Sequence, residues 1–259
     1  MRGRGKIPRA LAMAAAAGAI VSIIGVAASG LGARAGFWHF SVGFTILRWT
    51  AFLGFACALA GLFIGAAALA GGAYRALGWA LLSVVIGGVA AGVPFRWQQA
   101  AQSLPPIHDV TTDTQDPPRF IKAVGLRKDA GNPVAYGGEL VALIQQRSYP
   151  EIRPLRLGLA PGEAFALALD TAGKLGWEVT ASVPEEGRIE AVDATFWFGF
   201  KDDVVVRVTA AGEGSRVDVR SLSRVGTGDV GTNARRVKKF LGLMERAAGK
   251  RPAAPTSPP

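Results

Sequence analysis

The segment 108–116 holds the side chains of this chain that are best suited to chemistry. Asp109, Asp113 and Asp116 place three carboxylates close together in the sequence, beside two threonine hydroxyls. Hard divalent cations bind several oxygen ligands, so these three residues are candidates for a metal site. His108 precedes Asp109 and has the chemistry of a general base, which makes His108, Asp109 and Asp113 catalytic candidates for a hydrolase.

The same segment has a structural interpretation. Asp and Thr side chains bond to nearby backbone N–H groups, so residues 105–118 (PPIHDVTTDTQDPP) are expected to form a series of turns. The carboxylate spacing differs from the EF-hand pattern, and the glycine of that pattern is missing. A single histidine does not complete a typical zinc site. We therefore predict no cofactor.

A second cluster combines arginines with the start of a predicted helix. The glycine-rich stretch 226–231 (GTGDVG) follows a predicted strand, and the free N–H groups of a helix N-terminus attract phosphate or carboxylate. The stretch matches GxGxxG only superficially, because its strand belongs to an antiparallel meander and not to a βαβ unit. A capped glycine-rich turn is the alternative. The predicted ligand contacts are Arg220, Arg224, Asp229, Asn233 and Arg236.

Residues 161–248 show the periodicity of an α+β domain. A helix is predicted over 161–175, followed by strands over 177–183, 188–200, 204–210 and 216–222 and a helix over 230–248. Helices covering one face of a four-stranded antiparallel sheet form a two-layer domain, assigned to residues 98–248. Trp197 is expected on the open face as a sixth ligand contact. The Pro-rich tail, residues 249–259, is expected to be disordered.

The first 97 residues have the composition of a membrane anchor. Residues 1–95 contain no acidic residue, and three uncharged runs (10–33, 49–74 and 76–95) are long enough to span a bilayer. The shorter aromatic run 35–47 suits a membrane interface. The runs contain no Asp, Glu or Lys, which favours an anchor over a transporter. Cys57, the only cysteine, is expected to be a packing residue.

Charge distribution predicts the topology. Four basic residues in the first nine should keep the N-terminus cytoplasmic, and three spans then place the C-terminal domain outside. This describes a multi-pass protein of a bacterial inner membrane with a periplasmic domain. In the alternative, the first run is a cleaved signal peptide, which leaves the domain on the same side. Residues beyond 95 carry 22 of the 29 basic residues against 19 acidic ones, a near balance that argues against nucleic-acid binding.

Three segments together resemble a known family. They are 107–120, with IHDVTTDT and PPRF; 191–204, with AVDATFWFGF and DDV; and 221–241, SLSRVGTGDVGTNARRVKKFL. The chain resembles the uncharacterised envelope family catalogued as domain of unknown function 1499. The resemblance implies an envelope location and frequent N-terminal membrane helices, and it implies no activity or cofactor.

These observations favour a membrane-anchored envelope protein whose outward domain binds an envelope ligand or partner protein without catalysis. Its partners would be the lipid bilayer and that ligand or protein, and not nucleic acid. Two alternatives remain: an envelope hydrolase or metal-binding enzyme using segment 108–116, and a structural subunit of a membrane complex.

Overall fold

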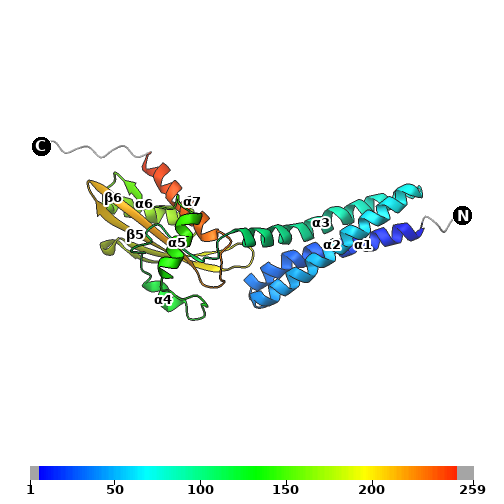
Figure 1. Cartoon of the computed structure of the whole chain (residues 1–259), viewed down its shortest axis with the longest axis horizontal. Helices are drawn as coiled ribbons and strands as arrows, with labels where there is room; N and C mark the ends of the chain where they lie inside the picture. Colours follow the sequence, from blue (N-terminus) through cyan, green and yellow to red (C-terminus); the bar gives the residue numbers. More distant parts are fainter. Residues whose placement is uncertain (1–5, 250–259) are drawn as a thin grey trace. The chain divides into compact units, whose positions relative to one another are not determined.

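The computed structural model describes residues 6–249, which form two compact units (Figure 1). One unit contains the helical residues up to 102 together with the short segment 196–199. The other contains residues 103–195 and those from 200 onward. The tail predicted to be disordered lies outside the described residues from position 250 on.

The first unit contains three long helices, α1 (Lys6–Arg34), α2 (Phe40–Ala70) and α3 (Tyr74–Ser103). Each is long and apolar enough to cross a membrane. The predicted bounds differ, because α2 begins nine residues before 49 and contains most of the run 35–47. A charged side chain such as Arg48 does not interrupt backbone hydrogen bonds, so it does not end a helix. The chain turns instead after Ala70, where Gly72 has a φ of +69°.

Small residues bring the helices of this unit together. A Cβ atom on Gly61 of α2 would lie 2.7 Å from the carbonyl oxygen of Ala80 in α3, so this position needs glycine. The Ser83 hydroxyl donates to the carbonyl of Cys57 at 2.7 Å. Gly88 and Gly92 of α3 have the same four-residue spacing as Gly61 and Gly65 of α2, but a Cβ built on either has no neighbour within 4 Å. Among the described residues, Gly88 and Gly92 therefore do not mediate packing between helices.

The second unit contains a six-stranded antiparallel sheet in the order β1-β6-β5-β4-β3, with β2 also paired to β6. The strands are β1 (Asp109–Thr111), β2 (Leu155–Leu157), β3 (Glu178–Val183), β4 (Arg188–Ala194), β5 (Lys201–Ala211) and β6 (Gly214–Ser223). The prediction of four strands was wrong by two. Strands of three residues are too short to show an alternating pattern, and only their pairing with β6 reveals them.

Two helices cover one face of the sheet, α6 (Pro161–Lys174) and α7 (Thr232–Ala248). Alternate valines of β5 and β6 point into this core, where the rings of Trp177 and Phe240 stack with centroids 5.1 Å apart. Burying one such large side chain stabilises the fold by about 1.5–3 kcal/mol. The core therefore lies between the sheet and these two helices.

The opposite face was expected to be open, and this prediction was wrong. Phe120 and Ala123 pack against Val205 and Leu222 in a second buried cluster. The covering segment includes α4 (Lys122–Leu126), whereas Val141 and Ile144 of α5 (Gly138–Ser148) pack against the first core (Figure 1). Prolines and glycines interrupt the apolar residues here, so the sequence shows no regular period from which these elements could be predicted.

Trp197 was expected to lie on a strand, but it lies between β4 and β5. Strand β4 ends at Ala194, and β5 begins at Lys201. Between them the Thr195 N–H donates to the Phe200 carbonyl at 2.9 Å, which closes a loop. The alternation of side chains between two faces, which predicted a strand over 188–200, therefore continues beyond Ala194, where β4 ends.

Candidate functional site

Asp109 and Arg220 form a buried two-point ion pair. Arg220 Nε lies 2.9 Å from Asp109 Oδ1, and Nη2 lies 2.7 Å from Oδ2. The guanidinium carbon also lies 5.0 Å from the Phe120 ring and 5.4 Å from the Tyr136 ring. Burial raises the pKa of Asp109, and the Arg220 hydrogen bond opposes this effect. Burial and the Asp109 charge raise the pKa of Tyr136 to about 12. Both members of the pair are therefore engaged inside the domain.

Asp113 and Asp116 pair with other arginines. Asp113 Oδ2 accepts from Arg216 Nη2 at 2.7 Å and from Arg207 Nη2 at 3.0 Å. Asp116 Oδ2 accepts from Arg207 Nη1 at 2.8 Å. Burial acts to raise the pKa of Asp113, but the backbone N–H groups of Asp116 and Gln115 and the two arginines outweigh it and lower this pKa. These contacts hold segment 113–116 against β5 and β6.

The three aspartates of the predicted metal site are therefore divided between two sets of arginine partners. Among residues 6–249, no group of three or more His, Cys, Asp or Glu side chains is arranged to hold a metal ion. His108 Nδ1 lies 3.5 Å from the Thr227 carbonyl oxygen. The carbonyl of His108 accepts from the Ser223 N–H at 2.9 Å and from the Asn233 side chain at 2.9 Å. The His108 backbone thus joins β6 to the start of α7.

The N-terminus of α7 has an anionic partner within the chain. Asp229 Oδ1 accepts from the Gly231 N–H at 2.8 Å, and Oδ2 accepts from the Asn233 N–H at 2.6 Å. A carboxylate here satisfies N–H groups that an external anion would otherwise contact. Asp229 was predicted to contact a ligand, but its carboxylate binds backbone N–H groups beside Gly231, the N-cap residue of α7.

Arg236 and Arg224 also contact carboxylates, on opposite faces of the sheet. Arg236 Nη2 lies 2.7 Å from Asp202, and Nε lies 2.7 Å from Asp193, on the face covered by α7. Arg224 binds Asp203 through two contacts of 3.0 and 2.8 Å on the other face. The structure therefore brings Asp229, Asn233 and Arg236 together, whereas Arg220 and Arg224 lie on the far side of the sheet.

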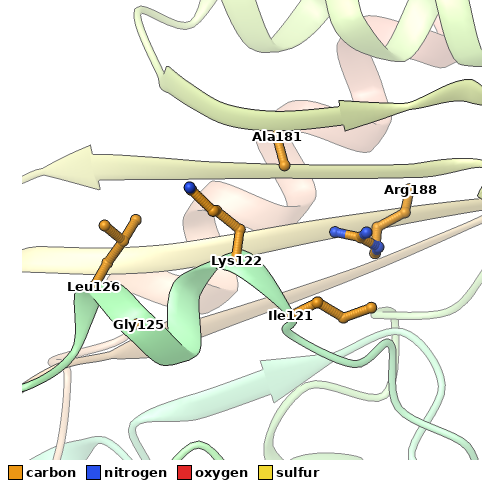
Figure 2. A pocket seen from close by; sticks show the side chains of 6 residues that line it. All are labelled: Ile121, Lys122, Gly125, Leu126, Ala181 and Arg188. Carbon is orange, nitrogen blue, oxygen red and sulfur yellow. The ribbon is translucent and has the colours of Figure 1, made fainter.

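A pocket that the sequence did not predict lies between α4 and strands β3 and β4 (Figure 2). It is open to the surface and has a volume of about 450 Å³. Figure 2 shows Lys122 and Leu126 extending from α4 toward the sheet, with Ala181 above them. The lining residues are Ile121, Lys122, Gly125, Leu126, Ala181 and Arg188. In the sequence, residues 119–128 mix apolar and basic side chains without a helical period. This mixture is the feature that could have indicated the pocket.

Glu190 fixes the position of α4. Its carboxylate accepts the backbone N–H groups of Ile121, Lys122 and Ala123 at 3.0, 2.9 and 2.8 Å, and it also pairs with Arg188. Glu190 is fully buried on β4. One wall of the pocket is therefore tied rigidly to the sheet.

The fold defines a class of protein in which helices of membrane-spanning length precede an α+β domain whose charged clusters are paired internally. The chain belongs to the family described as protein of unknown function (DUF1499), whose model matches residues 109–244. The matched residues include the aspartates of segment 109–116, the sheet and most of α7. A comparison with curated proteins finds no match.

Proposed function

We propose that this chain is a non-enzymatic, membrane-anchored envelope protein of bacterial type that binds an envelope ligand or partner. In this proposal the N-terminus is cytoplasmic, and the α+β domain lies in the periplasm. The four basic residues among the first nine, which precede the first uncharged run, support this orientation. The ligand would bind at the α4 surface, which we define as Ile121, Lys122, Val124 and Leu126.

The exposure of apolar side chains on a rigidly held helix carries the proposal. Ile121, Val124 and Leu126 are 58, 55 and 41 % exposed, although Glu190 and the buried Ala123 fix their backbone. Neighbouring exposed apolar residues commonly mark a binding site, and a preorganised site loses less entropy on binding. The exposure of the α4 surface is thus consistent with binding.

The ion pairs favour binding over hydrolysis. A general base or nucleophile needs access to its substrate. Asp109 is buried against Arg220, and Asp113 contacts two arginines. These interactions orient the aspartates toward the domain itself, which supports a structural role for the segment.

Native mass spectrometry of the full-length protein, extracted from its own membranes in a neutral detergent, tests the proposal. We expect a discrete added mass on the wild type. Changing Ile121 and Leu126 together to Ser should remove it. The matched control changes Leu140 and Leu143 to Ser, since both are exposed apolar residues on α5 of the same domain, and it should retain the added mass.

The size of the added mass identifies the kind of binding. A mass of a few hundred daltons indicates a small ligand, whereas a mass of many kilodaltons indicates a subunit of a larger complex. A wild type that carries no added mass under gentle extraction, or equal loss in both double variants, would contradict a binding role for the α4 surface.

A further inference from the structure

We infer that the pocket beside α4 binds an anionic amphiphile, a molecule with an acyl chain and a carboxylate or phosphate headgroup. This inference rests on the proposed function and names the chemical class of its ligand. Lys122 contacts the headgroup, and the apolar lining holds the chain.

The walls of the pocket suit an acyl chain. Ile121, Leu126 and Ala181 present aliphatic groups, and the pocket volume of about 450 Å³ falls within the range of small-molecule sites. Gly125 keeps one side open, because a Cβ built on it meets no atom within 4 Å. Large aliphatic residues that stay exposed at the mouth regain burial when a chain covers them.

The charge at the mouth suits a single acidic headgroup. The single Arg188 guanidinium pairs with two carboxylates, those of Glu186 and Glu190, so Arg188 has no positive charge left for a ligand. Lys122, by contrast, makes no ion pair with any residue in the described part of the chain. Figure 2 shows the Lys122 side chain extending from α4 toward the sheet, so the pocket lining includes both its aliphatic stem and its ammonium group, a combination that suits amphiphiles. One uncompensated cation fits a monoanion better than a polyanion.

The experiment uses the full-length protein in nanodiscs of zwitterionic lipid. The probes are two monoanions, decanoate and the diester decyl methyl phosphate, each carrying a photoreactive diazirine on its chain, and the corresponding neutral decanol. Peptide mass spectrometry then maps the crosslinks. We expect both acidic probes to label peptides covering 119–128 and 178–188 more strongly than decanol does. Labelling of the membrane helices provides an internal reference for partition into the bilayer.

Two pairs of matched variants test the contacts. Lys122→Gln should reduce labelling of these peptides by the acidic probes about fivefold, the effect of losing one exposed ion pair. Lys128→Gln changes an exposed lysine outside the pocket and should leave the labelling unchanged. Gly125→Leu fills the pocket and should reduce labelling about tenfold. Gly131→Leu, at another glycine with open space around its Cβ, is its control.

The outcomes separate this inference from the proposed function. Equal labelling by decanol and the acidic probes, or equal effects of the two lysine variants, overturns the headgroup contact. Strong labelling that Gly125→Leu leaves unchanged indicates insertion of the α4 surface into the bilayer and overturns the pocket. If the probes do not label the α4 pocket, but native mass spectrometry shows an added mass that disappears when Ile121 and Leu126 are changed to Ser, only the inference fails. If both experiments find nothing, both proposals fail.

Discussion

Arg220 shows how completely a single side chain can be engaged inside this domain. Its guanidinium binds Asp109 through two nitrogens, donates to the Val134 carbonyl at 2.8 Å and lies near two aromatic rings. The planar fork of arginine suits this arrangement, and the point charge of lysine does not. Arg220 therefore holds the segment that contains Phe120, Val134 and Tyr136 against the sheet.

Replacing Arg220 with Gln should destabilise the domain strongly. The change leaves the Asp109 carboxylate buried without its cation, which costs about 3–5 kcal/mol. Urea denaturation of the full-length protein in detergent measures this cost. Lys174→Gln, which removes the exposed pair with Asp170, is the control and should cost less than about 1 kcal/mol. Equal effects of the two variants would contradict a structural role for the buried pair.

Asp113 should make the stability of the domain depend on acidic pH. Its pKa in the folded protein is lowered below the ordinary value of 3.8, so its ionised form stabilises the fold. This contribution is complete above 3.8 and is lost as pH falls through the lowered pKa. The stability difference between wild type and Asp113→Asn should therefore be largest above pH 3.8 and should decrease below it. Denaturation curves at a series of pH values test this, and a difference that grows on acidification would refute it.

At the scale of elements, α4 depends on a strand residue distant in the sequence. This helix has only five residues, too few to be stable alone in water. Its first N–H groups bind the Glu190 carboxylate of β4, and Ala123 packs on the sheet. Tertiary contacts therefore create both the helix and the pocket beside it.

Glu190→Gln should loosen α4 without unfolding the sheet. A neutral amide accepts these N–H groups less strongly than a carboxylate, and bonds to charged groups contribute about 1.5–3 kcal/mol. Amide hydrogen exchange at residues 121–123 should become about tenfold faster or more. Glu186→Gln changes the other carboxylate partner of Arg188 and should leave exchange there unaltered. Unchanged protection in Glu190→Gln would show that packing alone holds α4.

At the scale of the whole molecule, the proposed topology makes a direct prediction. Cys57 is the only cysteine, so a Cys57→Ala background allows single new cysteines to be labelled. Lys239→Cys, at an exposed position of α7, should react with a membrane-impermeant maleimide in intact spheroplasts. Arg2→Cys should react only after lysis, because the basic tail is expected in the cytoplasm. If Arg2→Cys reacts in intact spheroplasts and Lys239→Cys reacts only after lysis, the orientation is the opposite of the one proposed.

The sequence predicted those elements whose pattern is local and regular. The helix predicted over 161–175 corresponds to α6, and the strand predicted over 204–210 corresponds to β5. Both have an amphipathic period long enough to recognise. Strands β1 and β2 were missed because three residues show no period. The α4 pocket was missed because its walls come from segments about sixty residues apart.

The sequence by itself determined the membrane-length apolar helices, the long strands and the family, since these depend on composition, local period and short sequence motifs. Only the tertiary structure decided the partners of the charged residues. Asp109 and Arg220 are 111 positions apart, and no local pattern states that they meet. An arginine in a sequence looks the same whether it faces a ligand or a buried carboxylate, because ion pairing depends on distance in space.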